Sequence, residues 1–360
     1  MHLLVDISAH GLGHLAQMGP VLNVLHERLP GMRLTVRSGL PLIQLRRRIV
    51  PTFEHLHETS DFGYVMHNAV DIDLEASARR YRDFHQNWPQ RIADEAARLV
   101  SHQVDAVLTD VAYLPLAAAA KIGIPAASVC SLNWADLFLH YFSGETWAAS
   151  IHGEILAAYN AANGFIRTLP GMPMADLRNT LTVAPIARLG LHDRTSIGAQ
   201  LGLNPADLWV LVALGGIEFR LPVEDWPSTP GMVWLVPRAW QVHARNVCAF
   251  DTAEVDFTDL LASVDAVLTK PGYGTFAEAA CNGIPVLYVS RGDWPEEPYL
   301  VAWLTAHGRA QEVSRDHLIS GNFVGLLESL WRQSAPATPL PAGASEAVTL
   351  LLGWLDLDAD

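Results

Sequence analysis

The sequence has few cysteines, no long uncharged apolar run and no basic N-terminal start. Its three cysteines, Cys130, Cys248 and Cys281, lie far apart and form no CxxC pair. No disulfide framework is therefore expected, which fits a reducing compartment. No segment is long and apolar enough to span a bilayer, and the first residues, MHLLVDISAHGLGH, do not resemble a signal peptide. We expect a cytoplasmic protein.

Basic residues are also scarce. The 360 residues include 24 Lys+Arg against 38 Asp+Glu, which gives a formal net charge of -14. A nucleic-acid binder needs a basic surface to displace counterions, and only the run Arg46-Arg47-Arg48 resembles one, so we expect no nucleic-acid partner. Hydrophobic residues make up 50% of the chain, which is enough for a large core and excludes extensive disorder. A phosphate group would have to be bound mainly by backbone N–H groups at helix N-termini.

An internal repeat predicts the architecture. Residues 104–109 and 264–269 both read VDAVLT, and the offset of 160 continues through Gly-Ile-Pro at 123–125 and 283–285. Each copy has a short apolar strand, a turn, an Ala-rich helix ending near Gly and a second strand after Pro. Each copy is thus expected to form one βαβ unit, and repeated units of this kind indicate a doubly wound α/β fold.

Further strands begin each half. LLVDIS (Leu3–Ser8) leads into the glycine-rich turn AHGLGH, and WVLVAL (Trp209–Leu214) leads into Gly215-Gly216. We therefore predict two Rossmann-like domains that face a central cleft. The predicted boundaries are 1–180 for the N-terminal acceptor domain, 190–340 for the C-terminal donor domain, and 343–360 for a C-terminal helix that could pack on either domain.

The two copies of the repeat differ in the turn after the first strand. The first copy has Asp110-Val111-Ala112-Tyr113, whereas the second has Lys270-Pro271-Gly272-Tyr273-Gly274-Thr275 where its helix begins. Glycines let backbone N–H groups approach an anion at the positive end of a helix, so this turn could bind a diphosphate. A tight turn followed by a capped helix is the simpler interpretation. Glu278 could complete a capping box with Thr275, or it could bind the hydroxyls of a ribose.

Acidic residues follow the second strand of that copy. VLYVS is followed by RGDWPEEP, which places acidic side chains at the carboxyl end of a strand, where open α/β sheets bind ligands. Carboxylates accept paired hydrogen bonds from sugar hydroxyls. A solvated loop is the alternative. The acidic residues are Asp293, Glu296 and Glu297.

The segment KPGYGTFAEAACNGIPVLYVSRGDWPEEPYL resembles the donor-binding half of GT-B glycosyltransferases, in particular the branch of the lipid II-forming N-acetylglucosaminyltransferase. SAHGLGH, KPGYGT and EEP together also resemble glycosyltransferase-like proteins related to the N-terminal half of plant arabinokinase. The resemblance implies a nucleotide-sugar donor, most often UDP-linked, and transfer of a hexosyl or N-acetylhexosaminyl group with inversion.

The resemblance also implies roles for individual residues. Glu278 would hold the donor ribose, Val255 would lie nearest the uracil, and Glu296 and Glu297 would contact the donor sugar. The diphosphate would face backbone groups of two turns, namely Gly215, Gly216, Gly272, Tyr273, Gly274 and Thr275.

Sugar transfer also needs a base that deprotonates the acceptor hydroxyl. Histidine suits this task because its pKa lies near neutrality. The resemblance favours His14 on the loop after the first strand, and His10 lies on the same loop. Asp110 could orient the histidine or act as the base itself. Gln17 stands where the arabinokinase-like pattern has Arg, so a nucleotide-sugar epimerase or hydrolase and a non-catalytic binding protein remain alternatives.

Other motifs carry weaker predictions. Asp71-Ile72-Asp73 has the letters of a metal-binding DxD motif but follows no clear buried strand, so we expect neither a metal nor another cofactor. Gly11-Leu12-Gly13-His14-Leu15-Ala16 fits a dinucleotide fingerprint, and the next strand ends near Arg37, which would favour NADP. The aromatic stretch Leu132–Trp147 predicts a packed helix. Otherwise it could form an acceptor pocket or a peripheral membrane contact.

Overall fold

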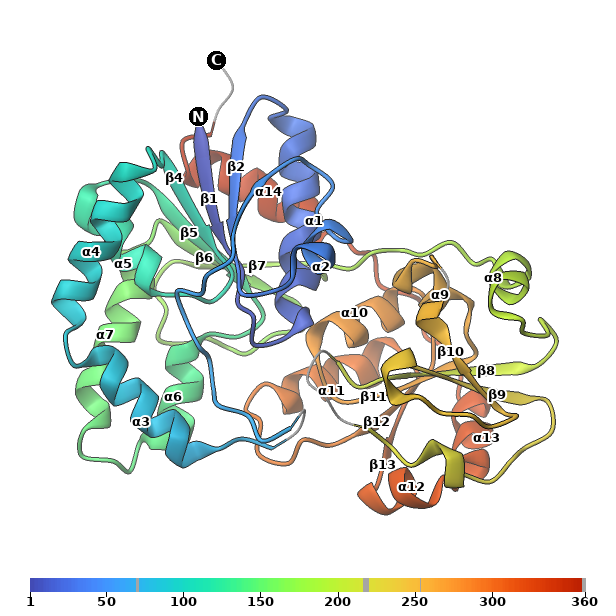
Figure 1. Ribbon diagram of the computed structural model, residues 1–360. Coiled ribbons are helices and arrows are strands. Elements are labelled where there is room, and N and C mark those ends of the chain that lie inside the picture. Colours follow the sequence, from blue (N-terminus) through green and yellow to red (C-terminus); the bar gives the residue numbers. More distant parts are fainter. Residues whose placement is uncertain (69–70, 216–219, 253, 358–360) are drawn as a thin grey trace. The chain divides into compact units, whose positions relative to one another are not determined.

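The computed structural model describes residues 1–68, 71–215, 220–252 and 254–357 (Figure 1). The chain forms two compact units. The first contains Met1–His67, Ile72–Ile186 and the chain from Ala342 onward, and the second contains Ala187–Pro341 together with Asn68 and Asp71. Gly216, one of the residues predicted to face the diphosphate, lies outside the described residues.

The first unit is built on a seven-stranded sheet whose neighbouring strands are all parallel. The strand order is β3-β2-β1-β4-β5-β6-β7, so the direction of winding reverses between β1 and β4. The strands are β1 (His2–Asp6), β2 (Arg33–Arg37), β3 (Glu54–Leu56), β4 (Ala106–Thr109), β5 (Ala126–Cys130), β6 (Gly164–Thr168) and β7 (Thr180–Val183).

Helices cover both faces of this sheet (Figure 1). One face carries α1 and α14, which contact each other, and the other carries α4, α5 and α7. The C-terminal helix thus packs in the first unit. The helices are α1 (Leu12–Arg28), α2 (Leu42–Arg46), α3 (Leu74–His85), α4 (Trp88–Ser101), α5 (Leu114–Ile122), α6 (Trp134–Phe142), α7 (Ala148–Ala161) and α14 (Gly343–Trp354).

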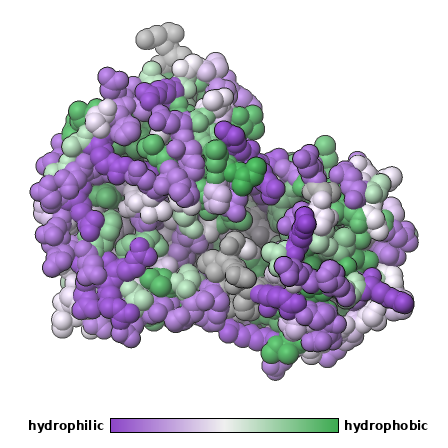
Figure 2. Space-filling view, viewed as in Figure 1, coloured by the Kyte–Doolittle hydropathy of each residue, from purple (hydrophilic) through white to green (hydrophobic). Residues whose placement is uncertain are grey.

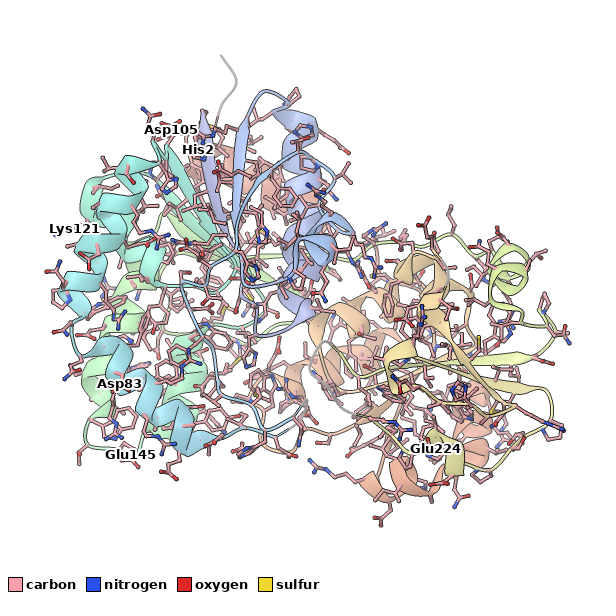
Figure 3. All side chains as sticks on the ribbon, in the orientation of Figure 1. His2, Asp83, Asp105, Lys121, Glu145 and Glu224 are labelled. Atoms are coloured by element: carbon pink, nitrogen blue, oxygen red, sulfur yellow. The ribbon has the colours of Figure 1, made fainter. Side chains whose placement is uncertain are left out.

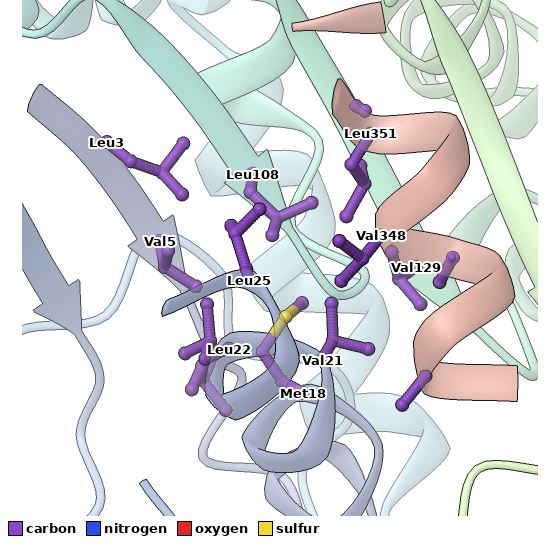
Figure 4. Packing of buried hydrophobic residues seen from close by; sticks show 14 of the residues in the cluster. Leu3, Val5, Met18, Val21, Leu22, Leu25, Leu108, Val129, Val348 and Leu351 are labelled. Atoms are coloured by element: carbon purple, nitrogen blue, oxygen red, sulfur yellow. The ribbon is translucent and has the colours of Figure 1, made fainter. Parts of the chain in front are cut away.

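The core beneath α1 and α14 follows from the period-two pattern of the strands. Leu3 and Val5 on β1 point to the same face as Leu108 on β4, and all three are fully buried (Figure 4). The apolar side of α1 packs onto them. Val348 and Leu351 of α14 close the same cluster, although they lie more than 200 residues further along the chain.

The second unit repeats this plan with a six-stranded parallel sheet of order β10-β9-β8-β11-β12-β13. Its winding reverses between β8 and β11. The strands are β8 (Leu208–Ala213), β9 (Met232–Val236), β10 (Val247–Ala249), β11 (Ala266–Thr269), β12 (Val286–Val289) and β13 (Ala310–Val313).

Helices of the second unit enclose two apolar clusters, one containing Phe276 and one containing Phe323, both fully buried. These helices are α8 (Arg194–Leu201), α9 (Phe257–Ser263), α10 (Tyr273–Cys281), α11 (Glu297–His307), α12 (Arg315–Ser320) and α13 (Val324–Arg332), with short 3₁₀ turns η1 (Val223–Asp225), η2 (Arg238–Trp240) and η3 (Phe250–Thr252).

The repeat predicted from the sequence forms two βαβ units, as expected. The first is β4-α5-β5 and the second is β11-α10-β12, and the strands within each are parallel. Gly123 and Gly283 adopt the left-handed conformation after their helices, with φ of 75° and 73°. β4 lies at the reversal of winding in the first sheet, and β11 lies at the reversal in the second. The turns that differ between the two copies therefore occupy the positions where doubly wound sheets bind ligands.

Polar residues dominate the face seen in Figure 2, and hydrophobic residues appear between them in separate patches. Scattered apolar residues of this kind are ordinary for a protein surface. Among the helices that the structure describes, none combines the length and the apolar character needed to cross a bilayer.

Candidate active site

His14 and Asp110 meet at the reversal point of the first sheet. Asp110 directly follows β4, and His14 lies in the first turn of α1, whose N-cap is Gly11. His14 was predicted on a loop and is instead helical, because the helix begins at Leu12. His14 Nδ1 lies 3.0 Å from Asp110 Oδ2, and both side chains are buried. Nε2 of His14 has no hydrogen-bond partner among the described residues.

The pKa of His14 lies well above its usual value. Burial opposes protonation, but the negative charge and the hydrogen bond of Asp110 outweigh that effect. The Asp110 carboxylate is itself fixed, because it accepts hydrogen bonds from the backbone N–H of Ser8, at 2.8 Å, and of Val111. A carboxylate bound to Nδ1 fixes the orientation of the imidazole and leaves Nε2 as the reactive nitrogen.

His10, which is half-buried, lies beside this pair. Its ring meets the Trp134 ring edge-on, with centroids 5.4 Å apart, and its centroid is 6.5 Å from that of His14. Its backbone N–H donates to Ser8 Oγ at 3.4 Å. The three predicted catalytic residues, His10, His14 and Asp110, are therefore brought together in the first unit.

Asp61 belongs to the same cluster and was not predicted. Its Oδ2 accepts hydrogen bonds from Ser8 Oγ at 2.9 Å and from the indole Nε1 of Trp134 at 2.8 Å, while Oδ1 has no partner among the described residues. Burial and the neighbouring charge of Asp110 raise the pKa of Asp61 to about 6. Because Asp61 lies in a loop between β3 and α3 with no motif around it, the sequence carries no signal for it.

A second buried network lies at the ends of β1 and β2. The parallel register pairs Asp6 with Arg37, and the guanidinium donates to Asp6 at 2.9 and 2.7 Å and to Glu95 at 2.5 Å. Arg37 is 3% exposed, so it is not available to a 2′-phosphate. The dinucleotide-binding alternative therefore loses the residue that would have favoured NADP.

In the second unit, the turns after β8 and β11 lie side by side. Thr269 Oγ1 donates to the carbonyl of Ala213 at 2.6 Å, which joins the ends of the two strands. Gly215 has a φ of 95°, and a Cβ atom there would lie 3.3 Å from Cε of Lys270. Gly215 thus provides both the left-handed backbone and the space that the Lys270 side chain occupies.

The helix after this turn starts earlier than predicted. Gly272 is the N-cap of α10, with no side-chain cap, and Tyr273 and Gly274 begin the first turn. Thr275 lies within that turn, so it does not cap the helix, and the predicted capping box with Glu278 is wrong. Glu278 is instead buried, with 2% exposure.

The acidic segment after β12 is folded rather than solvated at its centre. Arg291 stacks over Trp294, with its guanidinium carbon 3.8 Å from the ring centroid. Glu296 accepts from Trp294 Nε1 at 3.2 Å, and Glu297 accepts from the backbone N–H of Arg291 at 2.8 Å. Glu296 and Glu297 are buried at the start of α11, whereas Asp293 is exposed.

A cavity of about 670 Å³ opens at the carboxyl ends of β9 and β10. Its lining includes Pro237, Gln241, Val242, Asp251 and Thr252. Val255, predicted nearest the nucleobase, follows η3 and is partly buried against the apolar cluster around Phe276, so it does not itself line the cavity. The volume lies in the range typical of small-molecule sites.

The two aspartates of the DxD letters make separate interactions within the protein. Asp73 caps α3 by accepting from Ala76 N at 2.8 Å, and Asp71 pairs with Arg315 at 3.1 Å. Within the described residues, no three His, Cys, Asp or Glu side chains are grouped as metal ligands.

The aromatic stretch contains α6 and packs inward, as predicted. Trp134, Phe138 and Phe142 are buried, and the Phe138 ring lies 4.8 Å from that of Tyr81. Their burial leaves these three rings unavailable for a membrane contact.

Comparison with known structures identifies the architecture. The calicheamicin glycosyltransferase CalG4 superimposes with a TM-score of 0.62 at 18% identity, over 98% of both chains. The chain has the GT-B fold. A plant glycosyltransferase from Phytolacca americana, solved with UDP-2-fluoroglucose and pterostilbene, matches with a TM-score of 0.55 at 15% identity, over 99% of this chain and 94% of that one.

A structure named for a different activity also matches the chain. A structure described as a UDP-N-acetylglucosamine 2-epimerase from Listeria monocytogenes matches with a TM-score of 0.57 at 12% identity, over 99% of this chain and 97% of that one. In sequence, L-arabinokinase of Arabidopsis thaliana is 27% identical over 327 residues. This alignment covers 89% of the chain but 31% of the arabinokinase. No protein-family model matches the chain.

Proposed function

We propose that this GT-B protein is a cytoplasmic, inverting and metal-independent glycosyltransferase. Its donor would be a nucleotide-diphosphate sugar, with UDP as the favoured nucleotide. The observation that carries the proposal is the buried pair of His14 and Asp110, with Nε2 of the histidine unpartnered. A base held in this way can remove the proton of an acceptor hydroxyl as the hydroxyl attacks the anomeric carbon. Attack from the face opposite the leaving diphosphate inverts the configuration.

Asp110 would act as a positioning residue. It is fully buried and accepts two backbone hydrogen bonds, so it is poorly placed to reach an acceptor itself. Its charge would stabilise the imidazolium that forms when His14 takes the proton. Because Asp110 raises the pKa of His14, transfer should become faster as the pH rises above the usual histidine range.

The second unit would bind the donor. The N-terminus of α10 presents the backbone of Gly272, Tyr273, Gly274 and Thr275, which suits a diphosphate without a metal. Glu278 would hold the ribose. The cavity beside β9 and β10 would receive the nucleoside, with Val255, three residues after the lining residue Thr252, nearest the base. Glu296, Glu297 and Asp293 would contact the sugar.

Calorimetry with UDP, GDP, dTDP and NADP tests the donor assignment directly. We expect UDP to bind more tightly than NADP, because Arg37 is engaged within the protein. Failure of all three nucleoside diphosphates to bind would sink the transferase proposal. The base is tested with His14→Gln, which should retain UDP binding and lose transfer, with His57→Gln, an exposed histidine, as the matched control.

A nucleotide-sugar epimerase is the second candidate, favoured by the epimerase structure that shares the fold. Product analysis separates the two. An epimerase interconverts UDP-sugars without an acceptor, whereas a transferase releases one UDP for each glycosylated acceptor.

A further inference from the structure

Lys270 is a cation at the predicted diphosphate site. It follows Thr269, the last residue of β11, and precedes the N-cap of α10 by two residues. The side chain is half-buried, and its ammonium forms no hydrogen bond or ion pair with the residues that the structure describes. A cation that is withdrawn from water without a partner costs free energy, so its retention at this point favours a role in binding an anion.

The surroundings of Lys270 separate it from an ordinary surface lysine. Gly215 leaves the space that the side chain fills, with Nζ 3.8 Å from where a Cβ atom would lie. The charged groups that act on it are Arg291, after β12, and Glu296 and Glu297, at the start of α11. Both carboxylates are already hydrogen-bonded, to Trp294 and to the backbone of Arg291.

We propose that the ammonium group of Lys270 binds the diphosphate of the nucleotide donor beside the N-terminus of α10, and that it does so only while protonated. The inference rests on the proposed function and adds to it a side chain that supplies charge where no metal does. Lysine offers three donors and a compact charge to phosphate oxygens. The backbone of α10 would fix the position of the diphosphate, and Lys270 would compensate its charge.

Donor affinity should therefore depend on pH near neutrality. Burial and the charge of Arg291 lower the pKa of Lys270 to about 7, against the opposing effect of the two glutamates. A bound diphosphate favours the charged amine, so binding takes up a proton. The protonated fraction of a group with this pKa falls roughly thirty-fold between pH 6 and pH 8.5, which sets the largest loss of affinity expected from Lys270.

The chain has only two lysines, Lys121 and Lys270, which makes the test unusually clean. Lys121 is exposed at the end of α5, where it is labelled in Figure 3, and serves as the matched control. UDP binding is measured by calorimetry at pH 6 and pH 8.5 for the wild type, Lys270→Met, Lys270→Arg and Lys121→Met. Affinity ratios between proteins at one pH cancel the titration of UDP itself.

We expect Lys270→Met to weaken UDP binding about ten- to hundred-fold at pH 6 and only a few-fold at pH 8.5. Lys270→Arg should bind UDP at both pH values, and Lys121→Met should match the wild type. Heats in two buffers of different ionisation enthalpy should show proton uptake in the wild type that Lys270→Met lacks.

Two results would overturn the inference while leaving the transferase proposal intact. One is UDP binding that is equally tight in the wild type and Lys270→Met. The other is a ratio of their affinities that stays the same at both pH values, which would mean that Lys270 acts through packing alone. If Lys270→Met fails to fold, the comparison of wild type with Lys270→Arg decides, because only the wild type should lose affinity as the pH rises. Failure of every nucleoside diphosphate to bind the wild type would refute the proposed function itself.

Discussion

The pair of His14 and Asp110 makes a prediction that needs no knowledge of the acceptor. Asp110→Asn keeps the size of the side chain and removes its charge. Its oxygen can still accept one backbone N–H, but His14 loses the carboxylate 3.0 Å from its Nδ1. The pKa of His14 should therefore fall, because burial, which favours the neutral ring, is no longer outweighed.

The magnitude follows from the type of interaction. A hydrogen bond to a charged group contributes about 1.5–3 kcal/mol, and one pKa unit corresponds to about 1.4 kcal/mol. Asp110→Asn should thus remove about 1.5–3 kcal/mol of the interaction that favours the protonated ring, and the pKa of His14 should fall accordingly. The pKa of His14 is raised in the folded protein. The pair therefore gives its full stabilisation at pH values below the pKa of histidine in the unfolded chain, and this stabilisation is lost as the pH rises through the pKa of His14 in the folded protein.

Two measurements check this reasoning. NMR titration of the His14 ring protons, assigned with His14→Gln, should show the lower pKa in Asp110→Asn. Urea unfolding should show a stability difference between wild type and Asp110→Asn that is largest below pH 6.5 and smaller at pH 9. An unchanged His14 titration, or a stability difference independent of pH, would refute the pairing of these charges.

Three further predictions concern other residues. Glu278→Gln should weaken UDP binding by about 1–3 kcal/mol in calorimetry, and unchanged affinity would assign Glu278 a purely structural role. The pKa of Asp61 is raised to about 6, so the wild type loses stability as the pH rises through that value. Between pH 3.5 and pH 7 the free energy of unfolding of Asp61→Asn, measured with urea, should therefore increase by on the order of 3 kcal/mol relative to that of the wild type. No relative increase would contradict the raised pKa. Arg37→Met leaves two buried carboxylates without their cation and should cost about 3–5 kcal/mol at neutral pH, a loss that a thermal shift below a few degrees would disprove.

The sequence predicted the fold well because the two halves share a pattern that packing requires. Ala-Val-Leu must be apolar in each copy to lie in the middle of a sheet covered on both faces, and Gly before Ile-Pro must end the helix between strands. The same repeat placed Asp110 and Lys270 at equivalent positions, directly after β4 and β11. Their positions at the two reversals of winding follow directly from that topology.

Residues chosen by long-range packing could not be predicted in this way. Asp61 joins His14 only because a loop between β3 and α3 brings it to Ser8 and Trp134. Lys270 was visible in the turn, but the charges that act on it, Arg291, Glu296 and Glu297, come from a later part of the chain. Thr275 looked like a cap because cap residues precede helices, yet Gly272 starts α10 three residues earlier.

The return of α14 to the first unit affects how the protein can be divided. Residues from Ala187 to Pro341 are bounded on both sides by chain that belongs to the other unit. A single cut in either connection therefore cannot release two complete halves, because one fragment would carry α14 away from the core formed by Leu3, Val5 and Leu108. The second unit is an insertion in the first, so the core of the first unit combines residues that lie on both sides of the insertion.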